Sequence, residues 1–199
     1  MMVDNKELIE RIMDEIGDLS SVKIEDIPNI ELYMDQLTTF MDKHLSGTSR
    51  NPGQDKILTK TMINNYAKND LLPPPIRKKY SKDHVILLIF IYYFKSLLTI
   101  NDVQTLLEPL KERFHVSDTE GMTLSEIYTD IFEMGSAEFG PLKEDILRKY
   151  RMASEKFKDA KEPVKNEMEV FSFLAMLSLD VYIKKLIIEK VIDEIKGNI

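Results

Sequence analysis

The sequence predicts an all-α protein, and three observations lead to that class. Only 7 of the 199 residues are glycine, and runs of alternating β-branched residues, which would indicate strands, are absent from the sequence. Apolar residues recur instead at intervals of three and four, as they do on one face of a helix. With 43% hydrophobic and 31% charged residues, the chain has the composition of an ordinary globular protein and enough length for a core.

The composition also excludes several classes of chemistry. The chain has no cysteine, so it forms no disulfide, thiolate nucleophile or thiolate metal site. His44, His84 and His115 lack metal-binding spacing, and we expect each at the surface or at a helix end. No P-loop, dinucleotide-binding or nucleophile-elbow motif occurs, so we expect neither a cofactor nor an enzyme. The early charge at Asp4 is unlike a signal peptide and predicts a cytoplasmic protein.

The chain is expected to divide into three segments. Residues 1–28 should form a helix over 4–17, ended by Gly17, and then an acidic connector. Residues 29–108 should form the central unit, with a helix starting at Asn29 and a polar loop over 46–56 that is long enough to be mobile. Residues 109–199 should form a C-terminal helical domain.

A helix over residues 59–70 opens the most informative stretch of the central unit. Thr59 is a good N-cap, and Pro73 disfavours helical backbone at Leu72. The residues between these ends fall into two stripes at helical spacing. The apolar stripe consists of Met62, Ile63, Tyr66 and Ala67, and the polar stripe consists of Thr61, Asn64, Asn65 and Lys68.

The polar stripe combines amides, a hydroxyl and an amine, and it contains no acid. Asparagine pairs with the major-groove edge of adenine, while lysine contacts guanine or phosphate. The stripe therefore predicts base contacts in a major groove. A solvated helix face is the alternative interpretation, since Asn and Lys are common on any surface.

A basic cluster, Arg77-Lys78-Lys79, follows three consecutive prolines and leads into an apolar helix. Ser81 is the expected N-cap of that helix, which spans 82–97 and is apolar on nearly every side. Its apolar run is shorter than the roughly 20 residues that span a bilayer, so we expect it to be buried inside the protein. Asn101 should then cap another helix, which Pro109 ends or kinks.

This order of elements resembles the MerR-type family of bacterial transcription regulators over residues 62–103. MINNYAKNDLL at 62–72 lies along the family's recognition-helix motif, Tyr80-Ser81 and Val85 match the start of the next helix, and LTINDV at 98–103 matches the last helix. The resemblance implies a helix-turn-helix unit with a wing, shortened here because Ile76 to Lys79 replace the family's glycine turn. It identifies the chain as a member of a little-characterised bacterial branch, one described as a domain of unknown function.

Together with this resemblance, the polar stripe becomes the expected set of DNA base contacts. The expected contacts to the DNA backbone are Lys60, Tyr66, Arg77, Lys78, Lys79 and Tyr80. The charge distribution supports this location, because residues 50–84 carry eight basic and three acidic side chains. The net charge of the whole chain is −7, so the remaining residues together carry −12.

The C-terminal segment predicts further helices, beginning at Thr123 or Ser125, over 142–160, and over 164–196. The last helix is apolar around its whole circumference from Val170 to Ile183. One small domain rarely buries two such helices, so we expect the helix over 164–196 to form a symmetric dimer contact that includes Leu177 and Val181.

These observations predict a DNA-binding transcription regulator of bacterial type, which binds duplex DNA as a homodimer through the helix over 59–70. The C-terminal domain is expected to serve either dimerisation or the binding of a small-molecule effector of unidentified chemistry, and no membrane is expected. The alternative is a protein-interaction adaptor that keeps the MerR-like fold and has lost DNA binding. Three features favour the adaptor: the net acidity, the shortened wing, and the pair Asn64-Asn65 in place of the family's Arg-Tyr pair.

Overall fold

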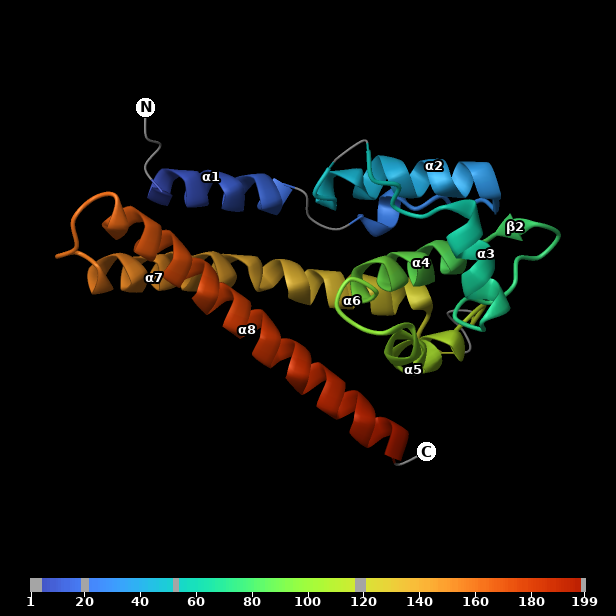
Figure 1. Ribbon diagram of the computed structural model, residues 1–199. Helices are drawn as coiled ribbons and strands as arrows, with labels where there is room; N and C mark the ends of the chain where they lie inside the picture. Colours follow the sequence, from blue (N-terminus) through green and yellow to red (C-terminus); the bar gives the residue numbers. More distant parts are fainter. Residues whose placement is uncertain (1–4, 19–21, 52–53, 117–120, 198–199) are drawn as a thin grey trace. The chain divides into compact units, whose positions relative to one another are not determined.

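The structure, a computed structural model, describes residues 5–18, 22–51, 54–116 and 121–197 (Figure 1). Most described residues are helical, which confirms the mostly helical class. The α-helices are α1 (Asn5–Asp18), α2 (Met34–Leu45), α3 (Lys60–Lys68), α4 (Lys82–Phe94), α5 (Ile100–Lys111), α6 (Leu124–Ala137), α7 (Phe139–Lys156) and α8 (Val164–Gly197). Two short 3-10 helices, η1 (Ile24–Asp26) and η2 (Ser46–Thr48), and two strands, β1 (Leu32–Tyr33) and β2 (Lys79–Tyr80), complete the elements.

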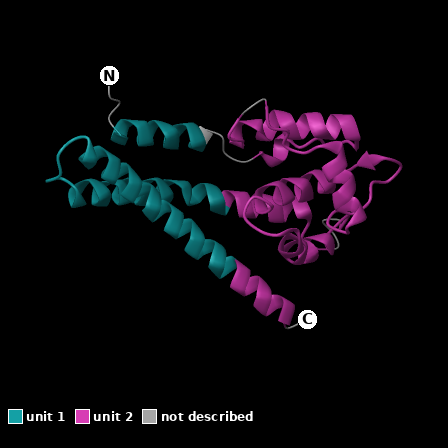
Figure 2. Ribbon diagram, in the orientation of Figure 1, with its two compact units in different colours: residues 1–20, 134–188 teal, residues 21–133, 189–199 magenta. Residues whose placement is uncertain are grey.

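The chain forms two compact units, which Figure 2 shows in different colours. Unit 1 comprises residues 1–20 and 134–188, and unit 2 comprises residues 21–133 and 189–199. This division differs from the three expected segments because α1 contacts α7 within unit 1, while α6 and α8 each begin in one unit and end in the other.

Helix α4 is the centre of unit 2. Every residue from His84 to Ile91 is buried, as expected for a helix that is apolar on all sides. The ring of Phe90 lies 5.7 Å from the ring of Tyr128 and 6.0 Å from that of Phe132, both on α6, so α6 covers one side of α4. The Tyr128 hydroxyl donates to the backbone carbonyl of Val22 at 2.5 Å, which ties α6 to the start of the unit.

The helices and strands of unit 2 differ from the sequence-based bounds at several ends. Helix α2 starts at Met34 rather than Asn29, because Leu32 and Tyr33 pair with β2 as an antiparallel strand. Helix α4 ends at Phe94 rather than at residue 97. Thr99, not Asn101, caps α5, and its side chain accepts from the backbone N–H of Asp102 at 3.3 Å.

Pro109 neither ends α5 nor marks its boundary, since the helix continues to Lys111. Proline removes one backbone donor, and here the lost bond falls in the last turn of the helix, where it disrupts least.

Unit 1 is built from α1, α7 and the first part of α8. Tyr150 and Ala153 of α7 are buried against Phe173 of α8, and the rings of Tyr150 and Phe173 meet edge-on at 5.6 Å. Gly17 lies within α1 rather than ending it. A Cβ atom at Gly17 would stand 2.8 Å from the Phe139 ring, so a larger residue at this position would force that ring to shift.

Helix α8 leaves much of its apolar surface exposed. Phe171, Leu179 and Tyr182 are 66%, 61% and 62% exposed, and Val181 is also exposed. Leu177, which we expected at a dimer contact together with Val181, packs instead against the core of unit 1. Among the described helices, none is long and apolar enough to cross a membrane.

Candidate nucleic-acid interface

Helix α3 is held at both ends. The Thr59 side chain accepts from the backbone N–H of Met62 at 3.1 Å, which confirms the predicted N-cap. At the other end Asp70 adopts a left-handed conformation, with φ of 56°, and the N–H groups of Leu71 and Leu72 donate to the Tyr66 carbonyl. The completely buried Ile63 anchors the inner face of the helix, so its outer face is fixed in orientation.

The predicted polar stripe lies on this outer face. Thr61, Asn64, Asn65 and Lys68 are all exposed. None of these four side chains makes a hydrogen bond or ion pair with another residue in the part of the chain that the structure describes. The stripe therefore presents its full set of hydrogen-bond donors and acceptors to solvent.

A short β-hairpin stands where the sequence indicated only a shortened wing. The hairpin turns between Ile76 and Lys79, whose N–H and C=O groups exchange two hydrogen bonds of 3.2 and 2.9 Å. On its other side β2 pairs with β1, where Tyr33 lies opposite Lys79 and Leu32 lies opposite Tyr80. The turn residues Arg77 and Lys78 both have positive φ, 51° and 65°. This is the pattern of a two-residue type I′ turn, which usually contains asparagine and glycine.

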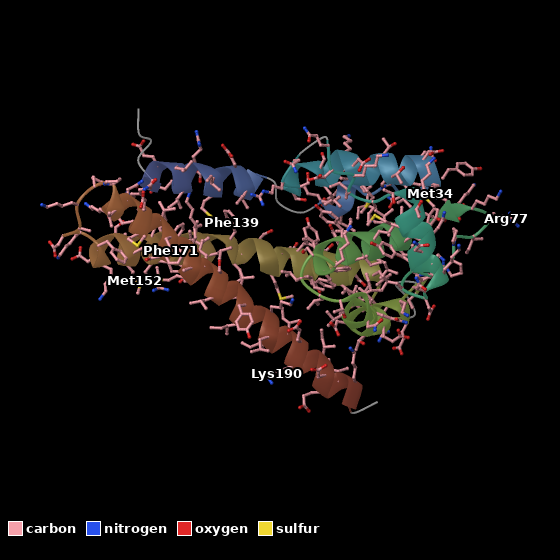
Figure 3. All side chains as sticks on the ribbon, in the orientation of Figure 1. Met34, Arg77, Phe139, Met152, Phe171 and Lys190 are labelled. Carbon is pink, nitrogen blue, oxygen red and sulfur yellow. The ribbon has the colours of Figure 1, made fainter. Side chains whose placement is uncertain are left out.

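The backbone conformation at the hairpin tip is strained. Residues other than glycine pay about 1–2 kcal/mol each to adopt the left-handed region. Arg77 and Lys78 are both exposed, and neither has an ion-pair partner among the described residues. Figure 3 shows Arg77 pointing outward from the hairpin. Two unpaired cations therefore stand at a strained, exposed tip, which is a place where function commonly accounts for strain.

The other expected backbone contacts divide into two groups. Lys60 pairs with Asp35, and Lys79 pairs with Glu31 at 3.5 Å and lies 5.6 Å from the centre of the Tyr33 ring. Both lysines would have to share or exchange these partners to bind a phosphate. Their acidic partners come from the segment that carries β1 and from the start of α2.

Tyr66 and Tyr80 require a correction. They are only 8% and 2% exposed, and burial raises the pKa of both hydroxyls. Their rings fill the core beneath α3 and the hairpin, because tyrosine supplies large apolar area at these positions. Both residues therefore support the candidate surface from below, and we do not retain them as principal contacts.

His84 caps the start of α4, directly after β2, a role that the sequence did not indicate. Its Nδ1 accepts from the backbone N–H of Ser81 at 2.9 Å, which forms a capping box at the start of α4. The residue is 1% exposed, against the expectation of a surface or helix-end histidine, although it does lie in the first turn. Burial lowers the pKa of His84, and the backbone carbonyls of Pro74 and Pro73 act against this shift.

Lys111 of α5 holds the end of α3. Its Nζ donates to the Asp70 carbonyl at 2.9 Å and pairs with the Glu108 carboxylate at 2.7 Å. The contact spans 41 positions in sequence, so no local pattern signals it.

The loop between α2 and α3 is attached to the core rather than free along its length. Asp42 accepts from the Ile57 N–H at 3.3 Å, Lys95 donates to the Ile57 carbonyl at 3.2 Å, and Thr48 and Tyr92 hydroxyls lie 2.6 Å apart. Our expectation of a mobile loop over 46–56 therefore does not fit its attached ends, and residues 52–53 lie outside the described part.

Comparison with known proteins identifies one family. The model of a family described as a domain of unknown function (DUF1836) matches residues 22–131, more than half of the chain. The match includes α2, α3, the hairpin, α4 and α5, and most of α6. No curated protein and no solved structure matches the chain.

Proposed function

We propose that this chain, which belongs to the DUF1836 family of domains of unknown function, is a DNA-binding transcription regulator. In this proposal unit 2 is a helix-turn-helix of the MerR type, in which α3 enters a major groove and the hairpin closed by Ile76 and Lys79, with β1 paired to β2 beside it, is a short wing. The observation that carries the proposal is an unpaired polar stripe on a capped, anchored helix, together with two unpaired cations at the hairpin tip. Both α3 and β2 contact α2, so one helix supports both parts of the surface.

The division of roles follows from the chemistry of each part. Asn64 and Asn65 offer amides that can pair with adenine, and Lys68 and Thr61 extend the same line along the helix. Arg77 and Lys78 offer charges without base specificity, which suits phosphate contacts. In this assignment α3 supplies specificity, while the hairpin tip supplies affinity and salt dependence.

We further propose that the regulator acts as a dimer. A single small DNA-binding module buries about 600–1,000 Å² of protein surface, and regulators of this size commonly pair two modules on a two-fold site. The dimer contact would lie outside α3 and the hairpin, since both must remain available to DNA.

A protein-interaction adaptor is the second candidate. Lys60 and Lys79 already pair with Asp35 and Glu31, which removes part of the positive charge from the proposed surface. The net charge of −7 also opposes general attraction to DNA. An adaptor would use the same exposed stripe to bind amide and hydroxyl groups of a protein partner.

Selection from a randomised duplex pool tests the proposal. The full chain should enrich a defined site, and Asn64→Ala or Asn65→Ala should each weaken binding to that site by about 1–3 kcal/mol while changing binding to random DNA little. Asn101→Ala, an exposed asparagine on α5, is the matched control and should change neither.

The contrary outcomes separate the candidates. Equal losses on selected and random DNA would assign the asparagines to the DNA backbone. A chain that enriches no site and binds no duplex at low salt would contradict DNA binding and leave the adaptor.

A further inference from the structure

Helix α8 has one face that packs inside unit 1. Phe173 and Leu177 contact the core around Tyr150, and Asp180 accepts from Lys149 of α7 at 2.9 Å. Lys184 pairs with Asp180 at 3.2 Å on the same face. These positions, 173, 177, 180 and 184, follow helical spacing and define the inner face of α8.

A second apolar stripe lies about half a turn away. Each of its positions is two residues from an inner position, and two residues turn a helix by about 200°. We call this set the outer stripe: Phe171, Ala175, Leu179, Tyr182 and Leu186. All except the small Ala175 are exposed, and Leu174 and Ile183 beside the stripe are exposed as well. The stripe contains no charged residue, and Figure 3 labels Phe171 at its start.

We propose that the outer stripe pairs with the outer stripe of a second copy of this chain. The inference rests on the proposed function in one respect, since it supplies the contact that two DNA-binding units need. Taking about 200 Å² for a large side chain, the six large residues of the stripe and its flanks present about 650 Å² per copy. If all of this area were covered, two copies would bury at most about 1,300 Å², which reaches the lower end of the range of a stable, specific interface.

The composition of the stripe favours a second copy over other partners. A symmetric contact covers the same patch on both chains, so one apolar stripe satisfies itself without another protein. Ala175 lies among the larger side chains and allows two helices to approach closely. An uncharged face offers nothing to a nucleic acid, so the stripe and the DNA-binding surface have separate roles.

Light scattering tests the pairing. The wild-type chain should have twice its mass of 23.2 kDa, and Leu179→Glu combined with Tyr182→Glu should give a monomer that keeps its helical circular dichroism. Both residues are exposed in unit 1, so the double variant should fold. Met152→Glu is the matched control, because Met152 is an exposed apolar residue of unit 1 that lies on α7 rather than on the outer stripe, and this variant should remain a dimer.

Disulfide cross-linking provides an independent measurement, since the natural chain has no cysteine. Single cysteines placed along the outer stripe should give cross-linked dimers, both within one variant and when two such variants are mixed. Met152→Cys, on α7, should not. A wild-type chain that stays monomeric at high micromolar concentration, or a dimer that persists in the folded double variant, would overturn the inference.

The two proposals fail separately. A dimer that binds no duplex would leave this inference standing and remove the proposed function. A monomer that binds a selected site tightly would leave the proposed function standing and remove this inference.

Discussion

Helices α4 and α8 both contain long runs of apolar residues, yet these residues are buried in α4 and largely exposed in α8. Every residue from His84 to Ile91 in α4 is buried, whereas α8 exposes Phe171, Leu179 and Tyr182. The difference lies in their neighbours. α5 and β2 contact α4 and the rings of α6 cover another side, while the described contacts of α8 within unit 1 lie on its inner face. Similar hydropathy therefore does not distinguish a core helix such as α4 from a helix that, in our proposal, offers an association surface, as α8 does.

The largest effect should come from truncating one leucine in each helix. Leu88→Ala in α4 should lower the free energy of unfolding by about 2–5 kcal/mol, because the site is completely buried. Leu179→Ala in α8 should cost less than about 0.5 kcal/mol in the monomer, as for other surface changes.

Denaturant unfolding at several protein concentrations separates the two variants. The cost of Leu179→Ala should grow with concentration as dimer forms, and the cost of Leu88→Ala should not. If both variants lost the same unfolding free energy at every protein concentration, the proposed difference between a buried α4 and an associating α8 would be contradicted.

The hairpin tip tests whether strain in unit 2 is retained for function. Replacing Arg77 by Asn and Lys78 by Gly provides the residues that a type I′ turn prefers, and should stabilise the fold by about 1–2 kcal/mol. The same double variant should bind duplex DNA more weakly, because it loses two cations. Thermal unfolding measures the expected gain in stability, and a DNA titration measures the expected loss of binding. Unchanged stability would refute the strain that we assign to this turn.

Lys111→Met removes the contact that holds Asp70 while it keeps most of the side-chain volume. We expect a loss of about 1 kcal/mol in stability, the usual net contribution of one hydrogen bond. Hydrogen exchange at Leu71 and Leu72 should accelerate, because their N–H groups bond at the end of α3. If exchange there is unchanged, α3 ends independently of α5.

The smallest expected effect is a pH dependence that arises at His84. Burial lowers the pKa of His84 in the folded chain relative to about 6.5 in the unfolded chain. The unfolded state therefore binds the proton first, so the stability from His84 is present above pH 6.5 and is lost as pH falls toward the lower folded pKa. His115 and Asp83 lie beside the ring and act on the same pKa in opposite directions.

His84→Gln keeps a capping acceptor at this position and removes the titration. The decrease in unfolding free energy between pH 7 and pH 5 should be smaller in this variant than in the natural chain. Identical pH profiles would show that His84 makes no contribution.

Local patterns predicted the parts of the candidate surface that local interactions determine. The Thr59 cap, the buried position of Ile63 and the exposed stripe of α3 all depend on residues within one helix, where 3.6-residue spacing is a reliable guide. The burial of α4 follows from its composition in the same way.

The remaining features depend on contacts that are distant in sequence or on unusual backbone. The hairpin was hidden because Arg77 and Lys78 occupy positions where glycine normally signals the turn. The burial of Tyr66 agrees with its place on the apolar stripe, whereas the burial of Tyr80 depends on packing that helical spacing does not reveal. Both were expected as DNA-backbone contacts together with the family resemblance, although Tyr66 also lies on the apolar stripe of its helix, and aromatic size is the better indication of a core role.

The salt dependence of DNA binding tests the central claim most directly, namely that α3 and the hairpin tip contact duplex DNA. Using a selected duplex, the slope of log K against log salt should be negative for the full chain. It should flatten by about 0.9 in each of Arg77→Ala and Lys78→Ala if each neutralises one phosphate. It should flatten by less in Lys68→Ala, which faces base edges in this assignment, and in Lys79→Ala, which already pairs with Glu31. Arg151→Ala, an exposed cation on α7, should leave the slope unchanged. A slope that none of the unit 2 variants alters, or the absence of binding at low salt, would contradict the account.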